Sequence, residues 1–403
     1  MMALTFASQL LSAGSTLILP TLGLATADLY AAATQMGLAS LTGIVVGIVY
    51  NLAIGRPNFR GWRLWAGLAA LFSIGIATVL FFLLRGQGLF DRLPINEGAV
   101  VIASFGLGGA LLSAGGVIAV REACLGRPNL LAGVTVAPNA ALFIAVGATA
   151  LFSSGVRTVW EVTIPGLAWA LAALVMLIVS FRRMRMHDGA PENLSESRHP
   201  STLQTVALAL GVITSSILPS FYMAAVVGLA VGLPYFLYLS TKLGNSFVSL
   251  GVNSILMVKY NWVQEHRLHL RWPVLLAIFG TALIALAVIA HVWKGSTLQP
   301  LSYVLVALAW LLLITAGALI IREMNAQRLS RALLTKVVVD LLVSITIAVT
   351  LTLHPSVTGY FGAFMGSQGA TLAVSGYSLG SRSLGVLGAL VVAASVLLGL
   401  SGW

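Results

Sequence analysis

The chain has 403 residues, of which 59 % are hydrophobic and 8 % are charged, and its mean hydropathy is +0.99. Soluble domains carry about 25 % charged residues, so this composition excludes a soluble enzyme or binding module and indicates an integral membrane protein. The net charge of +11 is interpreted as basic loops on one side of a membrane rather than as a nucleic-acid surface, and the single cysteine, Cys124, excludes an internal disulfide.

Apolar runs of about twenty residues follow one another along the chain, and each is long enough to cross a bilayer as a helix. No Lys or Arg precedes the first run, so we interpret it as a span rather than a signal peptide. The expected fold is an all-α polytopic membrane protein. Spans are expected at about residues 3–24, 29–54, 64–84, 98–120, 130–154, 161–181, 202–222, 226–258, 273–293, 299–321, 334–353, 358–380 and 384–402.

Positive charge is distributed unevenly between the loops that these spans define. With the N-terminus in the cytoplasm, seventeen of the 22 Lys and Arg residues lie in cytoplasmic loops, and Lys242 lies within a span. Cytoplasmic loops carry the excess of Lys and Arg. We therefore expect a multi-pass membrane protein with a cytoplasmic N-terminus. The cations of the outer loops are Arg85, Arg92, Arg157 and Lys294.

An internal repeat divides the chain into two halves. GVIAVREACLGR (116–127) matches GALIIREMNAQR (317–328) at an offset of 201, which also places Asn139 opposite Asp340. Each block ends the fourth span of its half on the cytoplasmic side, so the halves share one orientation and a pseudo-two-fold axis along the membrane normal. We expect an N-terminal six-helix lobe, a cytoplasmic linker, a C-terminal six-helix lobe and an additional transmembrane helix. Their residues are 1–181, 182–201, 202–382 and 383–403.

The span at about 226–258 carries a polar stripe with a lysine near its middle. At about 100° per residue, six polar side chains lie within roughly 80° of one another. A Lys at the centre of a bilayer costs about 2.5–3.5 kcal/mol on insertion scales, and Lys242 is far from both ends of the span. We expect this face to line a polar cavity; the alternative is a structural pairing of Lys242 with a buried acid. The candidate substrate-binding residues are Tyr235, Tyr238, Lys242, Asn245, Ser249 and Asn253.

Other ionisable residues near the spans are weaker candidates. Asp340 is a candidate for coupling to H⁺ or Na⁺, or for pairing with Lys336 one helical turn earlier, and we expect the pairing. Asp28 and Glu161 lie near the outer ends of spans, where we expect water to solvate them. HExxH, CxxC, GxxxxGK and GxSxG motifs are missing from the sequence, so no metal site or cofactor is predicted.

Stretches in both halves resemble the multidrug/oligosaccharidyl-lipid/polysaccharide (MOP) exporter superfamily, and within it the Wzx-type polysaccharide flippases. VREACLGRPNLLAG (120–133) and IREMNAQRLSRALL (321–334) resemble the family's loops between the fourth and fifth helices of each half. VGLPYFLYLSTKLGNSFVSLGVNSI (231–255) resembles the eighth helix, where related flippases often place a basic residue, and TGYFGAFMGSQGATLAVSGYS (358–378) resembles the twelfth. Pro234, which interrupts the start of the eighth helix, and a thirteenth span depart from the family pattern.

The resemblance implies a transporter of the bacterial cytoplasmic (inner) membrane that flips an undecaprenyl-diphosphate-linked oligosaccharide by rocking two lobes about a central cationic cavity. Expected partners are the lipid-linked oligosaccharide, membrane lipids and other membrane proteins of polysaccharide assembly, with no nucleic acid, cofactor or enzymatic activity. The alternatives are a cation-coupled drug exporter of the same fold, a solute transporter of unrelated fold, and a polysaccharide polymerase or ligase. The exporter would favour acids in the cavity, and the enzyme would need more than the short outer loop at about 85–97.

Overall fold

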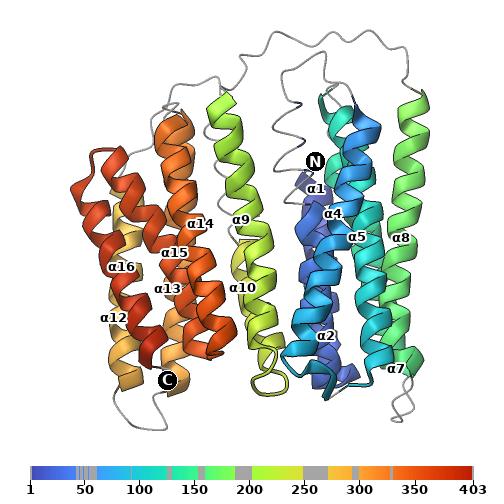
Figure 1. Ribbon diagram of the computed structural model, residues 1–403, viewed down its shortest axis with the longest axis horizontal. Coiled ribbons are helices and arrows are strands. Elements are labelled where there is room, and N and C mark those ends of the chain that lie inside the picture. Colours follow the sequence, from blue (N-terminus) through green and yellow to red (C-terminus); the bar gives the residue numbers. More distant parts are fainter. Residues whose placement is uncertain are drawn as a thin grey trace. The chain divides into compact units, whose positions relative to one another are not determined.

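The computed structural model of the chain is all-α (Figure 1). The residues that it describes form thirteen helices of fifteen residues or more and no strand. Seven of the described helical segments are long and apolar enough to cross a membrane, and two shorter ones are also apolar. The chain is therefore a multi-pass membrane protein, as its hydropathy predicts. The described residues are 2–41, 45, 49, 53, 61–91, 93–124, 129–152, 159–186, 202–247, 271–292, 299–326 and 330–401.

Each expected span contains a helix in the part of the chain that the structure describes. Most of residues 41–54 and all of residues 248–258, which end two expected spans, lie outside the described residues. The helices of the first half are α1 (Met2–Ile18), α2 (Leu24–Ser40), α4 (Trp62–Gly86), α5 (Ile95–Cys124), α6 (Asn129–Gly133), α7 (Val136–Phe152) and α8 (Val159–Met186). Those of the second half are α9 (Thr202–Val226), α10 (Leu233–Phe247), α12 (Arg271–Val292), α13 (Gln299–Ala326), α14 (Ser330–Leu353), α15 (Val357–Ser378) and α16 (Arg382–Ser401).

The chain divides into two compact units. Unit 1 comprises Met1–Pro200 and Leu208–Leu239, and unit 2 comprises Ser201–Ala207 and Ser240–Trp403. Residues Leu208–Leu239 are thus grouped with the first half of the sequence, and hydrogen bonds from the start of α10 to α1 and α2 account for that grouping. The expected lobe and linker boundaries stay a prediction.

Unit 1 has an aromatic core between α2, α5 and α8. The rings of Phe105 and Trp169 stack with centroids 4.7 Å apart, and Tyr30 meets Phe105 edge-on at 5.7 Å. Trp169 fits because two facing positions are glycines: a Cβ at Gly37 would lie 2.9 Å from its ring, and a Cβ at Gly108 would overlap it. A glycine of α2 and a glycine of α5 therefore permit close helix packing, as small residues do in membrane bundles.

The Tyr30 hydroxyl also supplies hydrogen bonds to the backbone of α8 beside its proline. Pro165 lies inside that helix, and a proline perturbs the ladder around it because it lacks an N–H and its ring needs space. The Tyr30 hydroxyl donates to the Val162 carbonyl at 2.7 Å and accepts from the Gly166 N–H at 3.0 Å. One side chain of α2 thus holds the proline-containing turn of α8.

Unit 2 is built on the close approach of α15 and α16. A Cβ at Gly388 would overlap the backbone of Ala373, and a Cβ at Gly376 would overlap Gly385. These glycines let the two helix backbones touch, so the C-terminal helix α16 is packed firmly; it also contacts α12. A thirteenth helix is present, as expected, and its crossing of the membrane stays a prediction.

The packing within the units repeats in the order that the internal sequence repeat predicts. In unit 1, α5 contacts α4 and α8, and α8 contacts α7; in unit 2, α13 contacts α12 and α15, and α15 contacts α14. The segment from α6 to the end of α7, 129–152, corresponds to α14, 330–353, at the same offset of 201. The first-half segment is broken at residues 134–135 because Pro138 clashes with the carbonyl four residues earlier, whereas valine stands opposite in α14.

Candidate functional site

The helix α10 turns its polar face inward and part of its apolar face outward. Phe236 and Leu243, two turns apart, are 54 % and 50 % exposed. On the opposite face Tyr235 and Tyr238 are 8 % and 3 % exposed, and Lys242 is half-buried. This orientation agrees with the polar stripe predicted from the sequence, because the polar side chains of α10 are buried or half-buried while apolar side chains on its other face are exposed.

The N-terminus of α10 is capped by a carboxylate from another helix. Asp28, on α2, is fully buried and accepts hydrogen bonds from the Gly232 N–H at 2.8 Å and the Tyr235 N–H at 2.9 Å. Gly232 adopts φ +84°, which favours glycine, and Pro234 is the second residue of the helix, where a missing N–H is tolerated. The span expected at about 226–258 starts later than predicted, because residues 227–232 form a turn and α10 begins only at Leu233, so Pro234 lies at the start of the helix.

The expectation that water solvates Asp28 is also wrong. Its two carboxylate oxygens bind two of the N–H groups that a helix N-terminus leaves without a partner inside the helix. A carboxylate is favoured there by the positive end of the helix dipole as well. The sequence holds no local signal for this contact, since the bonded residues are 204 and 207 positions apart.

The two tyrosines of the stripe serve the packing of unit 1. The Tyr235 hydroxyl donates to the Thr16 carbonyl of α1 at 2.8 Å, which adds a second link from α10 to the first half of the chain. Tyr238 is buried one turn further on. Both therefore fix the helix on which Lys242 stands, and their contact with a substrate stays a prediction.

Beyond Lys242, α10 lies close to α13 within unit 2. A Cβ at Gly244 would overlap the indole ring of Trp310, which is 3 % exposed and packs edge-on against Phe364 at 5.9 Å. Glycine at this position therefore sets the approach of the two helices beside the lysine. The side chain of Asn245, and residues Ser249 and Asn253, lie outside the described residues.

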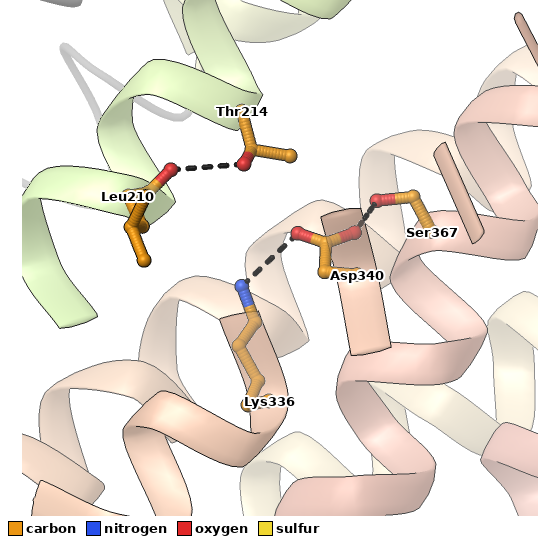
Figure 2. A network of polar contacts seen from close by, with 5 residues as sticks. All are labelled: Leu210, Thr214, Lys336, Asp340 and Ser367. Atoms are coloured by element: carbon orange, nitrogen blue, oxygen red, sulfur yellow. Dashed lines mark hydrogen bonds and ion pairs between the residues drawn. The ribbon is translucent and has the colours of Figure 1, made fainter. Parts of the chain in front are cut away.

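A second polar cluster lies between α14 and α15 in unit 2 (Figure 2). The Lys336 ammonium is 3.4 Å from one Asp340 oxygen, and the Ser367 hydroxyl donates a hydrogen bond to the other. The side chains of the ion pair are each 9 % exposed. The pairing of Lys336 with Asp340 that their spacing predicts is thus confirmed, while coupling of Asp340 to H⁺ or Na⁺ stays a prediction.

The first half carries an uncharged version of this cluster. The same offset of 201 places Thr135 opposite Lys336 and Asn139 opposite Asp340. The Asn139 amide donates to the Ser8 hydroxyl at 2.8 Å, and that hydroxyl is 2.8 Å from the Thr135 hydroxyl. One repeat therefore places neutral hydrogen bonds at this position and the other an ion pair, although the buried Asn139 Oδ1 has no hydrogen-bond partner among the described residues.

The described residues contain no group of three His, Cys, Asp or Glu side chains that could hold a metal ion. The expected outer loop at about 85–97 is shorter in the structure, because α4 continues to Gly86 and α5 begins at Ile95. Glu97 lies in the first turn of α5 and is 7 % exposed. The connector thus offers few residues for a catalytic site.

No protein-family model and no curated protein matches the chain. Among solved structures, the chain is similar to a MOP superfamily transporter from Pyrococcus furiosus, with 15 % identity over 100 % of this chain and 92 % of that one at a TM-score of 0.38. It is also similar to an inward-facing multidrug resistance MATE family transporter of the MOP superfamily, with 13 % identity over 100 % and 94 % at a TM-score of 0.37. Neither TM-score reaches 0.5, so the fold class rests on the helices themselves.

Proposed function

We propose that the protein is a membrane transporter that flips a polyprenyl-diphosphate-linked oligosaccharide across the bacterial cytoplasmic membrane for surface or exopolysaccharide synthesis. The observation that carries the proposal is Lys242, a half-buried cation on the inward, polar face of α10. A cation that is expensive to place within a bilayer marks a substrate or ion pathway by default. The resemblance of residues 231–255 to the eighth helix of flippases supports the same assignment.

The chemistry of the substrate suits such a site. The diphosphate is an anion that Lys242 can bind as a point charge, while the polyprenyl tail remains in the lipid. Asn245, Ser249 and Asn253 follow at helical spacing and offer hydrogen bonds to sugar hydroxyls. Lys242 would therefore offset the charge of the diphosphate while the amides and hydroxyls replace water around the sugar.

The test uses a deletion strain of the native host, complemented with the wild-type gene or with Lys242→Ala. We expect the deletion and the variant to accumulate lipid-linked oligosaccharide facing the cytoplasm and to lose surface glycan, with the variant protein still inserted. Lys242→Arg keeps the cation and should restore part of the export, and Arg271→Ala removes an exposed cation at the start of α12 as a control. Normal export by the Lys242→Ala variant would refute the anion-binding role.

A cation-coupled exporter of drugs or other small molecules is the second candidate. It is favoured by carboxylates that are buried within helices, among them Asp28 and Asp340, because acids inside a membrane protein can bind cations or couple to protons. The same deletion strain separates the candidates. Unchanged lipid-linked oligosaccharide and surface glycan, with increased drug sensitivity, would select the exporter, and accumulation of exported but unpolymerised units would select a polymerase or ligase.

A further inference from the structure

We propose that Asp28 is a latch residue: its carboxylate holds the start of α10 to α2 and must release it each time the transporter opens outward. This inference rests on the proposed transport function and names a positioning residue for it. The latch comprises Asp28 and Thr16 of the first half of the sequence, and Gly232 and Tyr235 of the second. All four residues belong to unit 1.

Three hydrogen bonds close the latch. Asp28 accepts from the Gly232 and Tyr235 N–H groups at 2.8 and 2.9 Å, and the Tyr235 hydroxyl donates to the Thr16 carbonyl at 2.8 Å. Asp28 is fully buried, and Tyr235 is 8 % exposed. Hydrogen bonds to a charged group are stronger than neutral ones, and more so away from water. The latch is therefore stable while its bonds are formed, and because it has only three bonds, they can break in one step.

The turn between α9 and α10 packs against the end of α4 and the start of α2. A Cβ at Gly228 would lie 2.8 Å from the Gln87 carbonyl, just after α4, and a Cβ at Gly232 would lie 3.2 Å from the side chain of Leu24, at the start of α2. The charge pattern assigns the end of α4 and the start of α2 to the outer side of the membrane. The latch therefore closes the outer side of the protein.

The position of the latch gives it a defined role in transport. In alternating access, the two halves move against each other around a site near the middle of the membrane. The three bonds join α1 and α2 of the first half to the first turn of α10, seven residues before Lys242. In this structure the bonds hold residues 208–239 in unit 1; opening toward the outside requires the start of α10 to leave unit 1 and move with the second half of the chain, which breaks the bonds, and closing re-forms them. Asp28 thereby sets the fraction of molecules in which the face that carries Lys242 is accessible from the outer side of the membrane.

The first test measures exposure at the outer side without any substrate, so its result does not depend on the glycan. Thr16→Cys places a thiol at a position that is 1 % exposed, in a protein whose native Cys124 is replaced by Ser. A membrane-impermeant maleimide labels it in intact cells. We expect Asp28→Asn to raise the labelling rate about tenfold, the population shift that corresponds to about 1.4 kcal/mol.

The control is Glu161→Gln, which neutralises an acid at the start of α8 outside the latch, and we expect it to leave the labelling rate unchanged. A rate in Asp28→Asn equal to that of the parent would overturn the latch. An equal rise in both variants would overturn it as well, because it would indicate general loosening rather than release of α10.

A second variant tests the need for opening in the other direction. An ideal Cβ at Gly232 lies 3.4 Å from the Leu24 Cβ, close to the separation of about 3.5–4.5 Å in a disulfide. The pair Leu24→Cys and Gly232→Cys should therefore cross-link under oxidation; because φ +84° at residue 232 strains any side chain, export by the reduced double variant is the reference. We expect the oxidised protein to lose lipid export and a reductant to restore it. Full export by the completely cross-linked protein would show that α2 and α10 need not separate, and would overturn the latch.

Discussion

Removing the Lys336 ammonium should destabilise unit 2 more than removing its charged partner. Lys336→Met leaves the Asp340 carboxylate buried, with the Ser367 hydroxyl donating to one oxygen. At 3.4 Å, two unit charges attract by about 5 kcal/mol at an effective dielectric constant of about 20. Loss of one partner of a buried pair costs about 3–5 kcal/mol, and we expect Lys336→Met to fall in that range.

Asp340→Asn should cost less, because an amide oxygen can still accept from Ser367, and a neutral Asn139 already stands at the equivalent position of the first half, where its NH2 group donates to Ser8. The double variant Lys336→Met/Asp340→Asn should be more stable than Lys336→Met alone, since it leaves no unpaired buried charge. The free energy of unfolding is measured by SDS denaturation in mixed micelles, with Arg331→Met, an exposed cation on the same helix, as the control. A double variant no more stable than Lys336→Met would refute the reasoning.

Two further substitutions test the packing around the proposed site. Gly244→Ala should destabilise the protein by about 1–3 kcal/mol in SDS denaturation, because the new Cβ overlaps the Trp310 ring. The control Gly147→Ala, where nothing lies within 4 Å, should be neutral or slightly stabilising. Equal effects of the two substitutions would contradict the contact between Gly244 and Trp310. Tyr30→Phe should lower the free energy of unfolding by about 1–3 kcal/mol, because it removes the hydroxyl that bonds both the Val162 carbonyl and the Gly166 N–H. Tyr377→Phe, at a side chain that is 90 % exposed, should leave the free energy of unfolding unchanged in the same assay.

The helices could be predicted from the sequence because the bilayer demands long apolar runs. Contacts could be predicted where they are local: Lys336 and Asp340 are one helical turn apart, and their ion pair forms as the spacing predicts. Ser367, which completes that cluster, is 27 residues away and gave no such signal.

The latch could not be predicted for the same reason. Asp28 looked like a solvated residue at the end of a span, because its hydrogen-bond donors follow 204 and 207 residues later. Periodicity did assign the inward face of α10, since the exposure of Phe236 and Leu243 follows the helical repeat. It did not assign partners to Tyr235, whose contact with Thr16 depends on tertiary packing.

The most direct test of the proposed function is flipping by the purified protein. Proteoliposomes would contain lipid-linked oligosaccharide in the inner leaflet, and its arrival outside would be scored by digestion with an added glycosidase that cannot cross the membrane. We predict that wild-type protein makes the oligosaccharide accessible and that Lys242→Ala, reconstituted at the same density, does so at least tenfold more slowly. Equal rates for wild type, Lys242→Ala and protein-free vesicles would contradict the proposed function.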